Sequence, residues 1–156
     1  MASNSELIES FYKAFQQKDY KTMQACYADN ATFNDPVFQD LNAIQVKAMW
    51  QMLLTRATDL SLEYANIFAD EHKGNAEWTA KYTFSGTGNK VTNKIKASFV
   101  FENGKIVQHV DDFDFYKWAK QALGVKGLLL GWTSFLHNKV SAQAKKNLEK
   151  FMRKDA

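Results

Sequence analysis

YADNATFNDP, residues 27–36, ends in the only proline of the chain. A residue that precedes proline is pushed out of the helical region into an extended one, so we expect Asp35 at a fixed bend between two helical segments. Phe33 and Val37 flank it with apolar bulk. A carboxylate among apolar neighbours has a raised pKa and can act as a proton base near neutral pH. The alternative is a surface Asp-Pro turn, which spacing alone favours.

Helical patterns lie on both sides of this stretch. A capping box that begins at Ser3 predicts a helix over residues 4–17. Asp19 can cap a short second helix, which we expect to extend to Tyr27. After the proline, Asn42 can cap a third helix with an apolar stripe.

From about residue 60 the apolar period changes from near four to two, which is typical of strands. The predicted strands cover residues 61–68, 76–84, 91–101 and 105–115. Successive hairpins predict an antiparallel sheet with one covered face and one wet face. Helices followed by a meander predict an α+β fold in which the helices lie on one face of the sheet.

The end of the chain is helical and basic. Residues 116–123 predict a helix that Gly124 can close, and residues 138–154 predict a last helix. Residues 117–154 hold 9 Lys and Arg but only Glu149 as an acid. We favour a helix that docks by its apolar stripe and keeps its lysines in water. Contact of this basic helix with an anionic membrane or an acidic partner is the alternative.

Length and composition indicate one domain with a real core, because the chain has 156 residues, of which 14% are aromatic. One cysteine, Cys26, excludes an internal disulfide and fits a reducing compartment. The first ten residues lack the pattern of a signal peptide, and the apolar runs are too short to span a bilayer. We therefore expect a soluble cytoplasmic protein. Nucleic-acid binding is not expected, because no strand interleaves aromatic and basic residues.

His109 and Asp111 stand two apart on the last predicted strand, so they share a face with Val107 and Phe113. Inward-facing, they would form a polar pair in an aromatic-lined hollow, where a histidine beside a carboxylate can relay protons. The alternative is a solvated strand end, since Asp111, Asp112 and Asp114 lie close together in the sequence.

The order of elements, the stretch YADNATFNDP and the stretch ENGKIVQHVDDFD (residues 102–114) resemble the nuclear transport factor 2-like superfamily. That superfamily includes ketosteroid isomerases, SnoaL-like polyketide cyclases and limonene-epoxide hydrolases. The resemblance implies a cystatin-like cone, a curved antiparallel sheet wrapped around N-terminal helices, and a homodimer that pairs sheet faces. It implies a domain over residues 1–118, with residues 119–156 as a C-terminal helical extension packed on the same domain.

The resemblance also implies roles for single residues. The catalytic base of the isomerases falls on Asp35, but their two oxyanion donors fall on Phe11 and Ala97, which cannot donate. Losing one such donor costs about 3–4 kcal/mol of barrier, so steroid isomerisation by that mechanism is not expected. Tyr12 neighbours Phe11 but points about a quarter turn away on the helix.

The polyketide cyclases carry a Gly-Lys-Ile-x-x-His-Trp-Asp pattern on the last strand. Gly104, Lys105 and Ile106 match it, as do His109 and Asp111, while Val110 replaces the tryptophan. The resemblance thereby also places His109, Asp111 and Phe113 inward. The epoxide hydrolases need an Asp-Arg-Asp set, and the only arginines here, Arg56 and Arg153, lie on no predicted pocket strand.

Two functions remain open. The first is a cofactor-free isomerase or cyclase in which Asp35 or Asp111 removes a proton from a carbon acid and His109 shares it. The second is a non-catalytic ligand-binding or dimerisation module, which the missing oxyanion donors favour. Neither calls for a metal or a cofactor. Six aromatic side chains are expected to hold an apolar ligand, which can be ring-shaped: Phe11, Phe33, Trp50, Trp78, Tyr82 and Phe113. The alternative, which helix and strand spacing alone favours, is that these aromatic residues are plain core.

Overall fold

The computed structural model describes residues 3–154. In chain order the elements are α1 (Asn4–Gln16), α2 (Tyr20–Ala25), β1 (Tyr27–Asn34), β2 (Leu41–Asn42), α3 (Ala43–Arg56), β3 (Ser61–Ala69), β4 (Lys73–Thr83), β5 (Lys90–Glu102), β6 (Lys105–Asp112), α4 (Phe115–Leu123), α5 (Val125–Leu130) and α6 (Ser134–Lys154).

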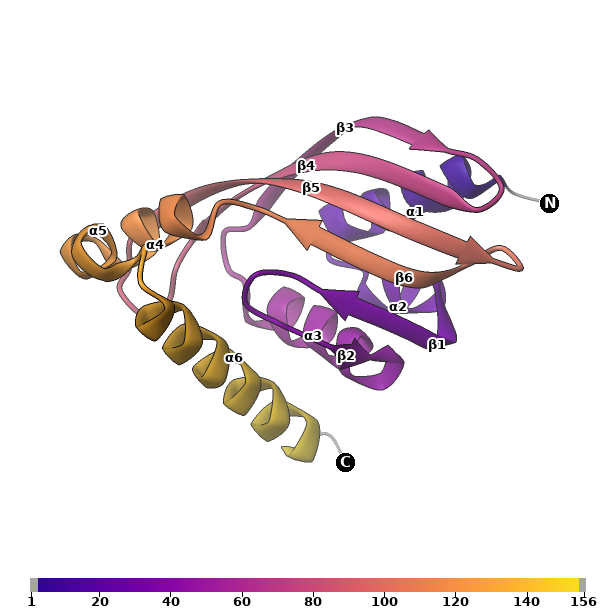
Figure 1. Cartoon of the computed structure of the whole chain (residues 1–156). Helices are drawn as coiled ribbons and strands as arrows, with labels where there is room; N and C mark the ends of the chain where they lie inside the picture. The colour runs from indigo at the N-terminus through magenta and orange to yellow at the C-terminus, as the bar shows by residue number, and fades with distance from the viewer. Residues whose placement is uncertain (1–2, 155–156) are drawn as a thin grey trace.

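One curved sheet runs through the molecule in the strand order β2-β1-β6-β5-β4-β3. Strands β3 to β6 form the antiparallel meander that the period of two predicts. The sheet bends over α1 and α3, which lie on its inner side, while α4 and α5 gather at one end (Figure 1). The predicted α+β fold, with a curved sheet wrapped around N-terminal helices, is confirmed.

The segment from residue 27 to residue 34 differs from its prediction. It is a strand, β1, and the second helix ends at Ala25 instead of extending to Tyr27. Strand β1 pairs in parallel with β6, and its register shifts between Tyr27 and Thr32. Because of this shift the buried side chains, Tyr27, Ala31 and Phe33, do not alternate along the whole strand. The bend that Pro36 imposes follows directly after this strand.

The predicted caps fix the starts of the first three helices. The side chain of Ser3 accepts a hydrogen bond from the Glu6 amide, and that of Asp19 accepts one from Thr22. Asn42 and Gln45 form a reciprocal capping box at α3. Each cap satisfies amides that a helix start leaves without partners, so these polar residues set where the helices begin.

The C-terminal helices pack on the rest of the fold. Helix α6 descends beside α3 (Figure 1). It begins at Ser134, four residues before the predicted start, and its Leu148 is fully buried in the main core. Phe151 and Met152 pack against the same core. The apolar stripe of α6 therefore docks on the domain as the sequence favours. No helix in residues 3–154 combines the length and the apolar character needed to cross a membrane.

Candidate functional site

A chain of hydrogen bonds crosses the interior between four elements. The Trp50 indole on α3 donates to the Tyr27 hydroxyl (2.9 Å), which lies 2.8 Å from Nδ1 of His109. On the other side of the ring, Nε2 of His109 lies 2.9 Å from Oδ1 of Asp111. The Trp78 indole on β4 reaches the same oxygen at 3.4 Å. The predicted pair of His109 and Asp111 is thus buried inside the cone.

The donors along this chain fit one tautomer of His109. The Tyr27 oxygen accepts a hydrogen bond from Trp50, and its own proton can go to Nδ1. In that arrangement Nε2 carries a proton and donates to Asp111. Both ring nitrogens of His109 thus have protein partners.

A bulge in β6 decides which side chains face inward. Val100 pairs with Gln108 and Phe101 pairs with Ile106, so Val107 is an extra residue in the ladder. Ile106, and not Val107, therefore shares the buried face with His109 and Asp111. Beyond the bulge the alternation holds, and the predicted inward orientation of the pair is correct.

Aromatic rings fill the space around His109. Phe99 lies 4.4 Å from its ring centre and Phe33 lies 5.0 Å away, and Phe11 and Trp50 close the remaining sides. The side chain of His109 has no exposed surface. The predicted ligand-contacting residues Phe11, Phe33 and Trp50 therefore lie around the polar chain, packed against it. Their contact with a ligand, and that of Trp78, stays a prediction.

Asp35 lies at the turn after β1, partly exposed. Its Oδ1 accepts hydrogen bonds from the amides of Val37 (2.7 Å) and Phe38 (2.6 Å). Its Oδ2 receives none from residues 3–154. Burial raises the pKa of Asp35 to about 7, helped by the negative charge of Asp111 and opposed by the two amides. One oxygen is thus anchored, while the other is free to take a proton near neutral pH.

Tyr82 and the C-terminal helices enclose the surroundings of Asp35. Burial raises the pKa of Tyr82, and the charge of Asp35 raises it further. The Trp118 indole on α4 donates a hydrogen bond to the Tyr82 hydroxyl at 2.9 Å, which opposes this rise. A second apolar cluster, centred on α4, includes the partly buried Val37, Tyr82 and Phe113. The predicted residues Tyr82 and Phe113 thus pack against both the main core and the cluster of α4.

Helix α6 touches the Asp-Pro turn directly. A ring nitrogen of His137 contacts the carbonyl oxygen of Pro36, and the Ser141 hydroxyl lies 3.5 Å from the same oxygen. The His137 ring stacks on Phe115 at 4.3 Å. This part of α6 therefore covers the turn that holds Asp35.

Two tyrosines of the site were not predicted from the sequence. Tyr27 was placed on a helix, although it bonds to His109 from a strand. Tyr12 was expected on the apolar stripe of the first helix, a quarter turn from Phe11, without a role in the site. It is fully buried, and its hydroxyl is the one buried side-chain polar atom in residues 3–154 without a hydrogen bond. Burial raises the pKa of Tyr12 well above its usual value, and the nearby Asp111 adds to the rise.

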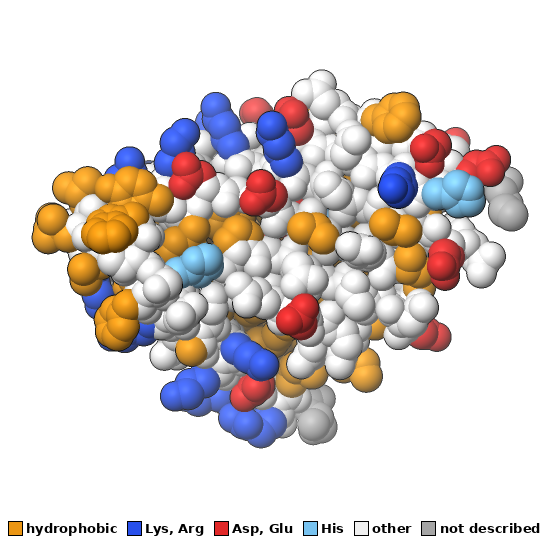
Figure 2. Space-filling model, viewed as in Figure 1, with side chains coloured by type: hydrophobic (Ala, Val, Ile, Leu, Met, Phe, Trp, Pro, Cys, Tyr) orange, Lys and Arg blue, Asp and Glu red, His pale blue; other side chains and the backbone are white. Residues whose placement is uncertain are grey.

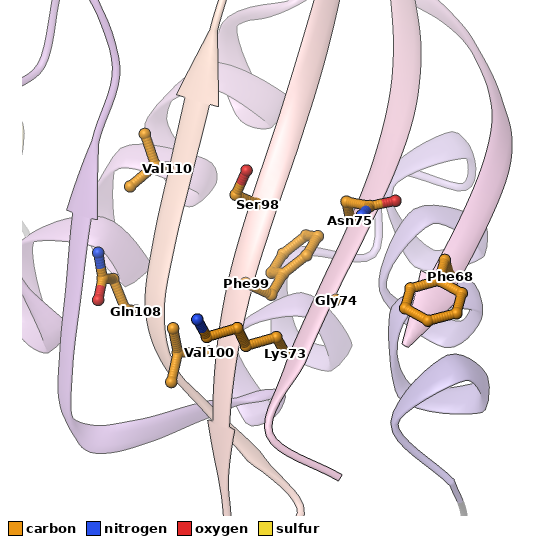
Figure 3. Close-up of a pocket in the computed structure, with 9 residues that line it drawn as sticks. All are labelled: Phe68, Lys73, Gly74, Asn75, Ser98, Phe99, Val100, Gln108 and Val110. Carbon is orange, nitrogen blue, oxygen red and sulfur yellow. The ribbon is translucent and has the colours of Figure 1, made fainter. Parts of the chain in front are cut away.

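Two hollows of the molecule lie away from Asp35, His109 and Asp111, although Tyr27 lines the second of them. One, of about 340 Å³, crosses the outer face of the sheet beside Val100, Gln108 and Val110 (Figure 3). A second, of about 470 Å³, lies at the β5–β6 turn beside Asn103 and Lys105. Neither is lined by Asp35, His109 or Asp111. Within residues 3–154, no three His, Cys, Asp or Glu side chains are grouped so that they could hold a metal ion.

The comparison with known families bears on the same part of the chain. Residues 8–109 match the sequence profile of the SnoaL-like domain. The chain belongs to the SnoaL-like domain family. The matched range runs from α1 to His109 and includes Asp35, so the predicted family is confirmed. The sequence has no significant match among curated proteins.

Solved structures share the fold of this SnoaL-like chain. A candidate polyketide cyclase from Pseudomonas putida matches with a TM-score of 0.64 at 20% identity, over 78% of this chain and 99% of that one. An LEH-like epoxide hydrolase from M. tuberculosis matches with 0.61 at 21%, over 85% and 94%. TerC, co-crystallised with polyporic acid, matches with 0.64 at 17%, over 76% and 96%. At these identities the likeness shows the fold alone.

The arginines of this SnoaL-like chain lie away from the polar interior. Arg56, the last residue of α3, is exposed and stacks its guanidinium over Phe151 at 5.5 Å. Arg153 is exposed on the last turn of α6. Within residues 3–154 no arginine therefore joins Asp35 and Asp111 in an Asp-Arg-Asp set.

Proposed function

We propose that the protein binds an apolar, ring-shaped small molecule and transfers a proton on it without a cofactor, with Asp35 as the base. The observation that carries the proposal is the state of this carboxylate. Its Oδ1 is held by two backbone amides, its Oδ2 has no partner in the described chain, and its pKa is about 7. General bases work best when their pKa lies near the working pH.

In the proposed step, Oδ2 of Asp35 takes the proton from a carbon next to a carbonyl group. The electron pair of the broken C–H bond moves into an enolate, and the proton returns to the ligand at the same or another carbon. The negative charge of Asp111 opposes ionisation of Asp35 and so increases its basicity once it is ionised. The chain from Tyr27 through His109 holds Asp111 in place.

The aromatic side chains in the neighbourhood of Asp35 indicate the class of ligand. Tyr82 lies near enough for the charge of Asp35 to raise its pKa, and it packs with Trp118 and Phe113 in one apolar cluster. Flat aromatic walls with few polar groups favour ring-shaped ligands. TerC, which shares the fold, was crystallised with polyporic acid, and another neighbour is a candidate polyketide cyclase. Both support a ligand of this class.

A ligand-binding module without catalysis is the second candidate. Phe11 and Ala97, at the two positions where the isomerases carry oxyanion donors, are fully buried and apolar. An enolate would gain no hydrogen bond from them. Rings also fill the interior around His109, so a ligand would be held beside Asp35 or would need these rings to move.

Proton exchange separates the two candidates even while the substrate is unidentified. The full chain is incubated in D2O with a panel of cyclic ketones and hydroxyquinones, and NMR records deuterium uptake at the carbon next to the carbonyl. Binding of the same compounds is measured by quenching of tryptophan fluorescence. We expect Asp35→Asn to retain binding and to lose exchange by at least about a hundredfold.

Two further variants complete the design. Asp111→Asn tests the second carboxylate, and Asp29→Asn, an exposed carboxylate on β1, is the matched control. Equal exchange by wild type and Asp35→Asn would contradict the proposed base. Binding without any exchange by the wild type would favour the non-catalytic module.

A further inference from the structure

The segment that joins α4 to α6 exposes a group of large apolar side chains. Six residues are exposed by 39% to 74% of their surface: Val125, Leu128, Leu129, Leu130, Trp132 and Phe135. We call these six the apolar tip. In Figure 2 hydrophobic side chains gather at the end of the molecule where Figure 1 shows α5, with basic side chains beside them and acidic ones a little further along the same face.

The fold holds the apolar tip in an ordered shape. A Cβ on Gly127 would lie 1.9 Å from the carbonyl oxygen of Ala119, so α5 lies with its bare backbone against α4. The face of α5 at Gly127, which has no side chain, therefore packs on α4, and the large side chains of α5 lie on its other faces. The Trp132 indole donates to the Leu129 carbonyl (3.1 Å), and Tyr116 donates to that of Leu128 (3.0 Å). The exposure of the leucines is thus built into the helix packing.

The helices that carry the apolar tip have charges of one sign over most of their length. Between Asp114 and Glu149 the chain has six lysines and no acidic residue. Lys120 and Lys126 stand on α4 and α5, and Lys139 follows on α6; all three are exposed. An apolar surface whose own helices carry exposed lysines complements a layer that is negatively charged outside and apolar beneath.

We propose that the apolar tip docks on the surface of an anionic lipid bilayer. The leucines and Phe135 enter the boundary between headgroups and acyl chains, and Trp132 lies at the polar–apolar interface, which an indole favours. The lysines contact the anionic headgroups. No described helix can cross a membrane, so the contact is interfacial. A second copy is a poorer occupant, because a two-fold contact through the tip would bring its lysines together.

Vesicle sedimentation with the full chain tests the proposal. The probes are vesicles of phosphatidylcholine alone and of phosphatidylcholine mixed with phosphatidylglycerol. We expect wild type to bind the mixed vesicles at least tenfold more tightly, and high salt to weaken that binding. The double variant Leu129→Ser with Trp132→Ser should lose at least tenfold in affinity. The double variant Lys120→Gln with Lys126→Gln should reduce the preference for the anionic vesicles.

Matched controls come from the sheet. Phe68→Ser removes an exposed aromatic residue elsewhere, and Lys94→Gln with Lys96→Gln removes two exposed lysines of β5. Both should bind as wild type does, and circular dichroism melts confirm that every variant folds. A second readout needs no disruptive change. The other three tryptophans are buried, so a vesicle-induced blue shift of fluorescence should vanish in Trp132→Phe.

Three results would overturn the proposal. They are no vesicle binding by the wild type, equal binding by the tip variants and the wild type, and a dimer that the tip variants convert to a monomer. The last would show that the tip is an interface between copies. Vesicle binding requires no turnover, so this proposal and the role of Asp35 fail independently.

Discussion

The hydroxyl of Tyr27 lies 2.8 Å from Nδ1 of His109, although the two residues are 82 positions apart in the sequence. Within residues 3–154 this hydroxyl is the only hydrogen-bond partner of Nδ1. The same hydroxyl also accepts a hydrogen bond from the Trp50 indole. It therefore satisfies two buried groups at once. The orientation of His109, and through it that of Asp111, depends on a residue at the start of β1.

Tyr27→Phe should destabilise the fold by about 2 kcal/mol, because it leaves the Trp50 indole and Nδ1 of His109 buried without partners. Urea unfolding monitored by circular dichroism measures the change. Tyr64→Phe is the control, since the Tyr64 ring stacks on Tyr12 and its hydroxyl makes no hydrogen bond within residues 3–154. Equal losses in the two variants would show that the hydroxyl of Tyr27 has no such role.

Tyr12→Phe should leave the stability unchanged or raise it by up to about 1 kcal/mol. The hydroxyl that this change removes is buried and has no partner, so the fold currently bears its desolvation cost. The same unfolding experiment applies. A loss comparable to that of Tyr27→Phe would mean that the Tyr12 hydroxyl has a bonded partner, such as an internal water.

The raised pKa of Asp35 predicts a dependence of stability on pH. The folded state has a pKa of about 7, whereas a free aspartate has about 3.9. The folded chain therefore binds more protons between these values, and its stability falls as pH rises from about 4 to about 7. The difference between these two pKa values corresponds to about 4 kcal/mol. Because Asp35 is partly exposed to water, which screens its charge, we expect Asp35→Asn above pH 7 to be more stable than wild type by about half of that, about 2 kcal/mol.

Urea unfolding of both proteins at pH 4 and pH 8 checks this sign. At pH 4 the two should be nearly equal, because Asp35 is protonated in the folded wild type. Asp29→Asn, an exposed change on the same strand, should follow the wild type at both values. A wild type that becomes more stable relative to Asp35→Asn with rising pH would contradict the raised pKa.

His137→Ala should lower the pKa of Asp35. The ring of His137 contacts the Pro36 carbonyl and helps to cover the turn, and burial is the largest cause of the raised pKa. Admitting water favours the charged carboxylate. NMR titration of the Asp35 carboxyl carbon should place the midpoint near 7 in wild type and lower in the variant. His72→Ala, an exposed change at the turn between β3 and β4, should leave the midpoint in place.

The sequence predicted the parts of this structure that depend on local periodicity and capping. Ser3, Asp19 and Asn42 each cap the helix they were expected to cap, and the alternation around His109 and Asp111 gave their inward orientation. These features depend on neighbours within a few residues, so a single sequence contains the whole signal.

Strand β1 shows what local patterns cannot give. Its Asp29, Asn30 and Asn34 have low strand propensity, and its shifted register breaks the alternation. Strand β1 is stabilised by its pairing with β6, and the residues next to β1 in the sequence contain no signal for that pairing. The rings packed around His109 agree with the alternative that spacing alone favoured, plain core. The sequence could not decide between that and a lined cavity, because the same aromatic residues can line a space or occupy it, depending on how the elements pack.

The parallel pairing of β1 with β6 has a consequence for how the protein forms. Strand β1 leaves the ribosome early, yet its partner is the last strand of the sheet. The intervening meander can assemble from neighbouring hairpins, whereas β1 must wait for a long loop to close. We therefore expect the segment that bears Tyr27 and leads into Asp35 to join the sheet late, so that the polar interior forms only when folding is nearly complete.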